Sequence, residues 1–189
     1  MSDYRKKVLI LLGSPRKNGN SAALAERIGA GAESAGARVE SLYINGMDIK
    51  PCQACWGCQK PDSHGCVIND EMQLVYPKLI EADAIVIATP VHCFNMSTQT
   101  KLWMDRCFAL MSYKGERRRQ RVGIAIAYGD TDPFTSGAVN VLRCFQDSYR
   151  YAGMDITGAV YGSALDPGDI RNNKRVMTAA EELGQKLVI

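Results

Sequence analysis

The sequence predicts one doubly wound α/β domain, residues 1–189, in which helices cover both faces of a five-stranded parallel sheet. Three observations predict this fold. Short β-branched runs alternate with longer segments of helical periodicity. Two of the runs, Lys7–Leu12 and Ala84–Ala88, are strongly apolar, as expected of strands covered on both faces. No repeat, low-complexity tract or linker interrupts the alternation. Right-handed crossovers then favour the strand order 2-1-3-4-5.

The elements of the first half follow in order. After the first strand, apolar residues at helical spacing predict a helix over Asn20–Ala35. Gly36 stands where such a helix ends, and Arg38–Ile44 alternates as a second strand. The next residues, from about 45 to 69, form an irregular, cysteine-rich insertion before the following helix. Long loops in compact domains are usually functional, so this insertion is a candidate site.

The second half continues the alternation. Apolar side chains on one side predict a helix over Glu71–Glu81, although Pro77 inside it weakens the prediction of an unbroken helix. After the Ala84–Ala88 strand, the same criteria predict helices over Ser97–Met111, Ser136–Ala152 and Val176–Val188 and strands over Arg121–Ala127 and Asp155–Tyr161. These elements complete the five predicted strands and their connecting helices.

Composition and charge exclude several classes of function. A net charge of +3 is too small to indicate nucleic acid or a membrane surface as a partner. No apolar run approaches the roughly 20 residues that a spanning helix needs. The basic start and short apolar run fit a first strand better than a secretory signal, so a cytoplasmic location is expected. The basic run Glu116–Arg121 is interpreted as a solvated loop, with a docking patch for an acidic electron carrier as the alternative.

The loop after the first strand has the features of a phosphate site. It runs from Gly13 to Ser21 and leads into a helix, where doubly wound folds bind phosphate. The N–H groups and dipole of a helix N-terminus favour an anion. Ser14 and Asn20 add donors, and Arg16 adds a guanidinium. The loop lacks the glycine patterns of dinucleotide and nucleotide triphosphate sites. An ordinary polar turn with a capped helix is the alternative.

This loop, together with residues 89–106 after the third strand, resembles the NADPH-dependent FMN reductase group of flavodoxin-like proteins. The resemblance covers essentially the whole chain and implies that FMN is the cofactor. It also implies that the FMN phosphate is held by Ser14, Arg16, Asn20 and Ser21. We add Asn18, from the same loop, as a candidate contact.

The resemblance further implies that the second loop lines the isoalloxazine ring of FMN, through Pro90, Val91, His92, Asn95 and Met96. Thr89 ends a buried strand at the carboxyl edge of the sheet, where ligands bind in such folds. Backbone amides of residues 92–96 can reach the polar edge of a flavin and tune its electronics. His92 departs from the tyrosine that is common in the family. The third loop adds Gly129 as a candidate contact, while turn formation explains Asp130 and Asp132 equally well.

Four of the seven cysteines crowd into the insertion, in the spacing Cys52-x2-Cys55-x2-Cys58-x7-Cys66. Three thiols at three-residue intervals can surround one cubane, and a fourth can return from a later turn. Four thiolates are the ligand set of a [4Fe–4S] cluster. A four-thiolate zinc site, a labile disulfide and thiols without a ligand are the alternatives. The three scattered cysteines are expected to be small buried residues.

Within the flavodoxin-like group, the cysteine motif resembles that of the iron-sulfur flavoproteins. This resemblance implies one [4Fe–4S] cluster beside FMN, in a homodimer or homotetramer. It also implies that the cluster of one subunit lies near the flavin of its neighbour, and that reduced ferredoxin or a similar protein supplies electrons.

Three hypotheses about function follow. In the first, the chain is an FMN-containing electron-transfer oxidoreductase that passes electrons from its cluster through FMN to a small-molecule acceptor such as oxygen, peroxide or a quinone. In the second, it is an NAD(P)H-dependent FMN or quinone reductase without a cluster. In the third, it is a non-enzymatic module that responds to flavin or metal. The first two require no catalytic side chain beyond the cofactor ligands.

Overall fold

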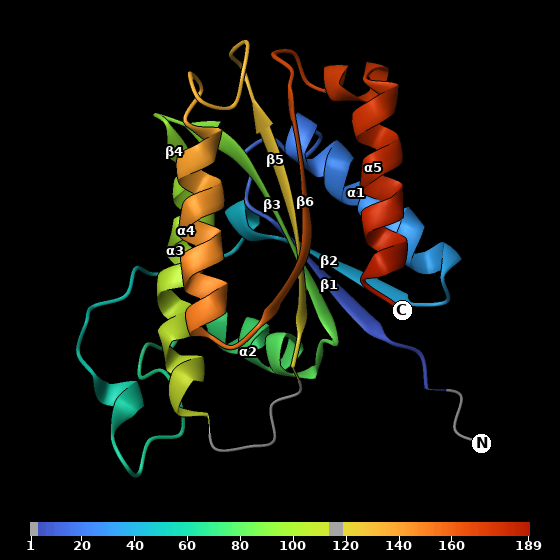
Figure 1. Cartoon of the computed structure of the whole chain (residues 1–189). Coiled ribbons are helices and arrows are strands. Elements are labelled where there is room, and N and C mark those ends of the chain that lie inside the picture. Colours follow the sequence, from blue (N-terminus) through green and yellow to red (C-terminus); the bar gives the residue numbers. More distant parts are fainter. Residues whose placement is uncertain (1–3, 114–118) are drawn as a thin grey trace.

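The central sheet contains five parallel strands: β1 (Lys7–Leu12), β2 (Arg38–Tyr43), β3 (Ala84–His92), β5 (Arg121–Tyr128) and β6 (Asp155–Ser163). In the computed structural model, which describes residues 4–113 and 119–189, they lie in the order β2-β1-β3-β5-β6. The five parallel strands therefore follow the predicted order 2-1-3-4-5, and the doubly wound fold is confirmed. Their carboxyl ends meet along the upper edge of the sheet in Figure 1.

One strand was not predicted. β3 continues past Ala88 to His92, and the chain then turns back as β4 (Asn95–Met96), which pairs with β3 in antiparallel register. A two-residue strand carries too little periodicity to be recognised from the sequence. The sheet therefore has a sixth, short strand in addition to the five that the sequence predicts.

Helices cover both faces of the sheet. One face is covered by α1 (Asn20–Ser34) and α5 (Lys174–Lys186) (Figure 1). The opposite face is covered by α2 (Met72–Glu81), α3 (Thr98–Arg106) and α4 (Ala138–Tyr151). Short 3-10 turns are η1 (Ile44–Gly46), η2 (Gly57–Gln59), η3 (Cys107–Ser112) and η4 (Asp169–Asn172). The helix expected over Ser97–Met111 is therefore α3 followed by the tighter η3. Helix α2 continues through Pro77 without a break.

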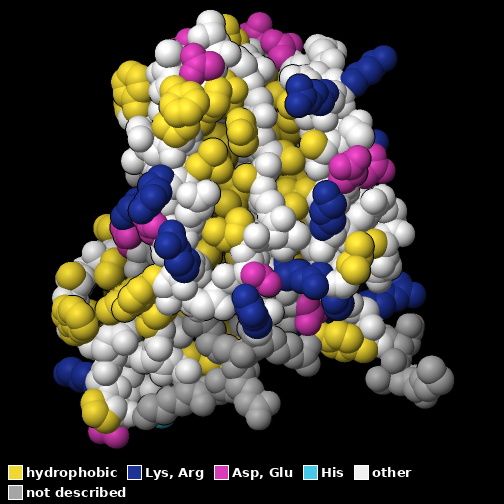
Figure 2. Space-filling model, in the orientation of Figure 1, with side chains coloured by type: hydrophobic (Ala, Val, Ile, Leu, Met, Phe, Trp, Pro, Cys, Tyr) yellow, Lys and Arg dark blue, Asp and Glu magenta, His cyan; other side chains and the backbone are white. Residues whose placement is uncertain are grey.

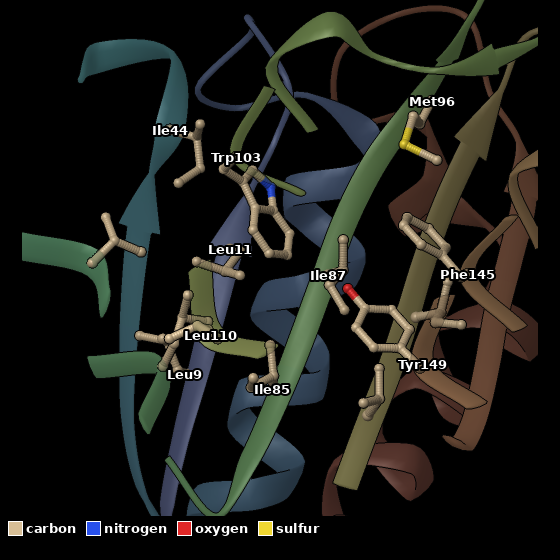
Figure 3. Close-up of a cluster of buried hydrophobic side chains, with 14 of the residues drawn as sticks. Leu9, Leu11, Ile44, Ile85, Ile87, Met96, Trp103, Leu110, Phe145 and Tyr149 are labelled. Atoms are coloured by element: carbon tan, nitrogen blue, oxygen red, sulfur yellow. The ribbon is translucent and has the colours of Figure 1, made fainter. Parts of the chain in front are cut away.

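Alternate residues of the strands form two cores. Leu9 and Leu11 of β1 pack under α2, α3 and α4, together with Ile85 and Ile87 of β3. Figure 3 shows these side chains between the sheet and Trp103. On the opposite face, Val8 and Ile10 and their neighbours pack against α1 and α5. Burial on both faces explains why these strands are apolar in sequence rather than alternating.

Two expectations concern the surface. Within the described residues, no helix has the length and hydrophobicity that a membrane span requires. Arg117 and Arg118, in the basic run considered for docking, lie outside the described residues. Arg119 forms an exposed ion pair with Asp155, with the two side-chain atoms 3.2 Å apart. Such an exposed pair contributes little to stability.

Candidate functional site

The loop between β1 and α1 leads into a helix that has no side-chain cap. Gly19 precedes α1, and no acidic residue occupies the first helical turn. Among the described residues, no backbone hydrogen bond uses the N–H groups of residues 20–22. Unpaired N–H groups at the positive end of a helix dipole bind anions such as phosphate. The start of α1 therefore has the free N–H groups that an anion site needs, and its contact with a phosphate stays a prediction.

Four of the predicted phosphate contacts surround this helix start. Ser14 and Ser21 are buried. The Ser14 hydroxyl accepts a hydrogen bond from the Arg16 N–H at 3.0 Å, which shapes the loop. The Ser21 hydroxyl has no hydrogen-bond partner among the described residues. Arg16 and Asn18 are exposed, and within the described part of the chain their side chains form no hydrogen bond or ion pair. These side chains are available to an anion.

The Asn20 side chain has a structural role. Its amide nitrogen donates to the carbonyl oxygens of Ala164 and Asp166, at 3.2 and 2.9 Å. Its amide oxygen accepts from the N–H groups of Gly168 and Ile170, at 2.9 and 3.2 Å. All the hydrogen-bonding groups of the side chain are thus used to hold the loop after β6 against α1. The contact of Asn20 with the FMN phosphate stays a prediction, and its backbone N–H is the group left for it.

A buried group of hydroxyls joins the first loop to the second. The Ser97 hydroxyl, just before α3, donates to the Gly13 carbonyl oxygen at 2.5 Å and lies 2.9 Å from the Thr100 hydroxyl. The Thr89 hydroxyl, at the end of the buried part of β3, lies 3.3 Å from the Ser97 hydroxyl. It also accepts a hydrogen bond from the backbone N–H of Ser97. Ser97, Thr89 and Thr100 are each fully buried. This network fixes the loop of residues 13–21, which we call the phosphate loop, relative to the hairpin formed by β3 and β4.

That hairpin has a strained tip. Cys93 and Phe94, between His92 and Asn95, have φ values of 47° and 63°. Two central residues with positive φ define a type I′ turn, which usually contains asparagine or glycine. Non-glycine residues held in this conformation are destabilising, and such residues cluster at ligand sites. The hairpin tip is therefore a candidate ligand contact.

The predicted ring contacts divide between the surface and the core. His92 and Asn95 are exposed, and Pro90 and Val91 are half-buried. Met96 is instead buried in the core, and Figure 3 shows its side chain close to that of Phe145. The Met96 side chain therefore belongs to the core, and a contact of Met96 with the ring stays a prediction that its backbone would have to make. Its backbone remains in the hairpin, opposite Val91.

The third loop follows β5. Gly129 is exposed, and a Cβ atom at this position would lie 2.8 Å from Leu165. The Asp132 carboxylate accepts from the N–H groups of Phe134 and Thr135, at 2.7 and 3.1 Å. These bonds lower the pKa of Asp132 and form a local turn. The interpretation of Asp132 as a turn residue is therefore confirmed.

A buried ion pair fastens both ends of the cysteine loop, which we define as residues 50–70. The Arg106 guanidinium, at the end of α3, donates to the Lys50 carbonyl oxygen at 2.7 Å and to both carboxylate oxygens of Asp70, at 2.5 and 3.1 Å. The Asp70 carboxylate also accepts from the Lys50 N–H at 2.8 Å. Burial alone would raise the pKa of Asp70, but these bonds lower it, so the carboxylate stays ionised.

All four motif cysteines line one pocket of about 630 Å³ between this loop, α3, η3 and α4. Cys58 is buried, Cys66 is half-buried, and Cys52 and Cys55 are exposed. Hydrophobic side chains gather over this part of the surface in Figure 2, and the pocket lining includes the exposed Trp56. The Trp56 ring contacts Phe108 edge-to-face, with the ring centres 5.4 Å apart, and thereby anchors the loop to η3.

The loop backbone suits an anionic ligand. Ala54 and Trp56, which flank Cys55, have φ values of 50° and 56°. Residues in the left-handed backbone conformation turn successive N–H groups toward a common centre, as in many iron–sulfur sites. The Gln59 side chain donates to the Cys58 sulfur at 3.3 Å. Hydrogen bonds to sulfur are a usual feature of iron–sulfur ligands.

Three residues that line the pocket have buried polar atoms without a hydrogen-bond partner among the described residues. Among the described residues, Trp103 Nε1, Arg106 Nε and the Tyr149 hydroxyl are buried without a hydrogen bond, and all three residues line the pocket. Burial raises the pKa of Tyr149 well above its usual value, so its hydroxyl remains a donor. In Figure 3, the polar atoms of Trp103 and Tyr149 both point toward β3. Unpaired buried donors in a native structure call for an acceptor.

The chemistry of the pocket therefore fits a cluster, with one qualification from geometry. Within the described residues, no three potential metal ligands are close enough to hold a metal as they stand. The number and type of ligands match a [4Fe–4S] cluster.

Two residues that hold the cysteine loop were not predicted as site residues. Arg106 and the nearby Lys101 and Asp105 match a Lys-x-x-x-Asp-Arg pattern of the resembled family, but a Lys–Asp pair four residues apart is more often helix support, so none of the three is claimed as a site residue from the sequence. Lys101 and Asp105 do form an exposed pair, 2.6 Å apart. Asp70 gives no signal of its own in the sequence. Cys93 was expected to be buried but is exposed at the hairpin tip.

Comparison with known protein sequences finds matches over most of the chain. The chain matches the family described as NADPH-dependent FMN reductase over residues 6–154. It is 32% identical to an iron-sulfur flavoprotein of Methanosarcina thermophila, over 80% of this chain and 77% of that protein. It is 38% identical to an iron-sulfur flavoprotein of Methanocaldococcus jannaschii, over 84% of this chain and 79% of that protein.

The fold is also found among solved structures. The NAD(P)H:quinone oxidoreductase from Methanothermobacter marburgensis superposes with a TM-score of 0.72 and 18% identity, covering 97% of this chain and 98% of that one. A flavodoxin from the domain Archaea superposes with a TM-score of 0.58 and 17% identity, covering 97% of this chain and 96% of that one. At these identities the likeness shows the fold.

Proposed function

We infer that this chain, which belongs to the NADPH-dependent FMN reductase family and within it to the iron-sulfur flavoproteins, transfers electrons between a [4Fe–4S] cluster and FMN. Its family makes it a flavin-dependent oxidoreductase that uses FMN. The cluster, its electron donor and its assembly are our proposals, and each is argued from the described residues below.

The FMN phosphate is assigned to the start of α1. The free N–H groups of residues 20–22 and the hydroxyls of Ser14 and Ser21 would bind its oxygens. Arg16 and Asn18 would close over it from the solvent side. The backbone of the strained hairpin, from Pro90 to Met96, would hold the isoalloxazine ring, with Gly129 on the third loop. These residues bind and orient the cofactor, and none is required to donate a proton.

The cluster is assigned to Cys52, Cys55, Cys58 and Cys66. The observation that carries this assignment is that all four thiols line one pocket, three of whose other lining residues have buried polar atoms without partners among the described residues. When bound, FMN exchanges one or two electrons and a [4Fe–4S] cluster exchanges one, so the pair links one-electron donors to two-electron acceptors.

The donor and acceptor follow from this pairing. The family suggests that NAD(P)H supplies electrons to FMN. A reduced ferredoxin would instead supply single electrons to the cluster and be oxidised in doing so. A small-molecule acceptor such as a quinone or peroxide would be reduced. We place the chain in the cytoplasm, because its seven free thiols fit a reducing compartment.

The position of α3 supports assembly into a homodimer or homotetramer. Ser97, which contacts the phosphate loop, precedes α3, and Arg106, which contacts the cysteine loop, ends it. Nine residues of helix separate these points by about 13 Å. In Figure 1 the hairpin lies at one end of α3 and η2 lies beyond the other. A second copy that places its cysteine loop at this chain's hairpin would shorten the electron path.

Analysis of anaerobically purified protein tests the cluster assignment. We expect one FMN and about four iron and four sulfide per chain, as for one cubane. Cys52→Ser and Cys66→Ser should lower the iron content and leave the FMN content unchanged. Cys144→Ala is the matched control, because this thiol lines the pocket but lies outside the motif. Zinc in place of iron, or iron that is independent of the motif, would overturn the assignment.

Mixing two variants tests the assembly. A Cys52→Ser variant keeps its flavin site, and a Ser21→Ala, Arg16→Gln variant keeps its cysteine pocket. If electrons cross between subunits, mixed oligomers should recover electron transfer that neither variant shows alone. A mixture that stays inactive, although mass measurement shows mixed oligomers, would place the path within one chain.

A second candidate function is an NAD(P)H-dependent FMN reductase without a cluster. It is favoured by the separation of the thiols, since no three potential ligands are grouped within the described part of the chain. A relative from Bacillus subtilis, 25% identical, is described as a putative NAD(P)H-dependent FMN-containing oxidoreductase. Flavin absorbance without iron, together with rapid NADPH oxidation, would favour this candidate over the first.

A further inference from the structure

The wall of the cysteine pocket contains a charged pair that neither the motif nor the flavin site explains. The side chains of Arg106 and Asp70 are completely buried, and they face each other in a two-pronged contact. Removing a charged pair from water is costly. The fastening of the cysteine loop requires the two Nη atoms of Arg106, which reach Asp70 and the Lys50 carbonyl oxygen.

The remaining nitrogen of Arg106 has no partner. Its Nε atom is buried and forms no hydrogen bond with a described residue, although the residue lines the same pocket as the four motif cysteines. A charged donor left unpaired in the interior is rare, because its lost hydration is not replaced. Arg106 thus has a free donor at the pocket, in addition to its contacts with the loop ends.

Cys66 is the motif cysteine best suited to this donor. Cys52 and Cys55 are exposed, and the Cys58 sulfur already accepts a hydrogen bond from the Gln59 side chain, whereas Cys66 is half-buried in the pocket that Arg106 also lines. An arginine side chain is always protonated in proteins, so Arg106 is a cation in the pocket. The Tyr76 hydroxyl donates to the Arg106 carbonyl oxygen at 3.0 Å, which further fixes the end of α3.

We propose that Arg106 is a positioning residue for the cluster: its Nε–H donates to the Cys66 sulfur when the cluster is bound, and its charge, partly offset by Asp70, raises the cluster's reduction potential. This inference rests on the proposed function. Reduction adds one electron, and therefore one negative charge, to the cluster. A hydrogen bond to a ligand sulfur and a nearby positive charge stabilise that more negative state.

Replacing Arg106 and replacing Asp70 should change the reduction potential of the cluster in opposite directions. Arg106→Met removes the donor and the positive charge, so the cluster should become harder to reduce. Asp70→Asn keeps an acceptor for the guanidinium and removes the negative charge, so the cluster should become easier to reduce. A purely structural clamp predicts otherwise, because both variants break the same ion pair and should disturb the loop in the same way.

Titration of the cluster potential, followed by its electron paramagnetic resonance signal, measures this effect in the loaded fraction of each variant. For each variant we expect at least a tenfold change in the ratio of reduced to oxidised cluster at a fixed potential, in opposite directions. A tenfold change corresponds to about 59 mV for one electron. The FMN potential in the same samples should stay within experimental error.

Two further variants complete the design. Arg106→Lys keeps the charge but loses the Nε donor, so it should lower the potential less than Arg106→Met. If Arg106→Met does not fold, Arg106→Lys and Asp70→Asn provide the same comparison. Arg143→Met is the control, because Arg143 forms an exposed pair with Asp147 on α4, away from the pocket lining. Its potential should match that of the unaltered protein.

The outcomes distinguish this inference from the proposed function. Absence of iron from the unaltered protein would refute the cluster itself. Iron-loaded variants whose potentials do not change, or change in the same direction, would refute the role of Arg106 and leave the cluster in place. A lower cluster potential in iron-loaded Arg106→Met together with a higher one in iron-loaded Asp70→Asn would support the role of Arg106.

Discussion

The replacement Gly13→Ala tests whether the contact between the phosphate loop and α3 determines FMN binding. A Cβ atom at position 13 would lie 1.9 Å from the Thr100 hydroxyl oxygen, far below an ordinary contact of 3.4 Å or more. It would also lie 3.1 Å from Thr100 Cβ and 3.2 Å from the Ala88 carbonyl oxygen. Gly13 cannot retreat easily, because its N–H donates to that same oxygen at 2.8 Å.

The magnitude follows from what must move. Thr100 has to turn away, which breaks the 2.9 Å contact between its hydroxyl and that of Ser97. Overpacking costs about 1–3 kcal/mol, and a lost buried hydrogen bond costs about 1 kcal/mol. Gly13→Ala should therefore lower the free energy of unfolding by about 2–4 kcal/mol, a large part of the roughly 5–15 kcal/mol typical of a domain. The displaced loop should also weaken FMN binding by tenfold or more, which is about 1.4 kcal/mol.

A double-mutant cycle isolates this contact. Thr100→Ala removes the hydroxyl that blocks the new methyl group, so the double variant should be more stable than the sum of the single effects predicts, by about 1 kcal/mol or more. Unfolding in urea measures stability, and quenching of flavin fluorescence measures FMN affinity. Gly13→Ala combined with Thr98→Ala, an exposed residue of the same helix, should be additive. Additivity in both pairs would refute the proposed contact.

Four further predictions follow from the same sites. Asn20→Ala should lower the free energy of unfolding by about 2–4 kcal/mol without FMN, because four hydrogen bonds, one buried and three partly buried, are lost. Urea unfolding of the apoprotein measures this. Arg16→Gln should weaken FMN binding by about 10- to 100-fold, as for one charge-assisted contact, and leave apoprotein stability unchanged; FMN titration at two salt concentrations checks it. Gly137→Ala should weaken FMN binding, since position 137 has a φ of 81° and a Cβ there would lie 2.5 Å from Phe94 Cα; the same titration would contradict this if affinity were unchanged. The pKa of Asp70 is lower in the folded protein than its value of 3.8 in the unfolded chain. The ionised carboxylate therefore stabilises the fold above pH 3.8. This contribution is lost as the pH falls below 3.8 and through the pKa of the folded state. Unfolding experiments in this acid range should show a weaker pH dependence for Asp70→Asn.

The sheet could be predicted from the sequence because its signal is local and repeated. Each strand is a short run of strand-forming residues between segments of helical period. The runs at β1 and β3 are continuously apolar, as expected of strands inside a parallel sheet covered on both faces. The position of the phosphate loop follows from the topology, since ligands bind at the carboxyl edge in these folds. The cysteine spacing indicates its own chemistry, because four thiols so close together have few other uses.

The contacts that shape the sites could not be predicted, because they join residues that are distant in sequence. Asn20 has the residue type and position of a phosphate donor, yet its partners lie about 145 residues further along the chain. Arg106 is joined to Asp70, which lies 36 residues earlier. Met96 belongs to a hairpin too short to show a period, so the side to which it points was not readable. In each case the side chain's partner, rather than its type, decides its role.

The flavin site that we propose needs little rearrangement to receive its cofactor, because the strained hairpin is held from both sides. On one side, Ser97 ties the residues after the hairpin to Gly13 of the phosphate loop. On the other, the Asn140 amide donates to the Phe94 carbonyl oxygen at 3.1 Å, and Gly137 leaves room for the hairpin tip. Left-handed residues at positions 93 and 94 persist only where neighbouring structure compensates for their strain. The start of α4 and the start of α3 therefore determine the hairpin's shape together. Because both helices are anchored in one core, changes in that core should reach the flavin through the hairpin rather than through direct contact.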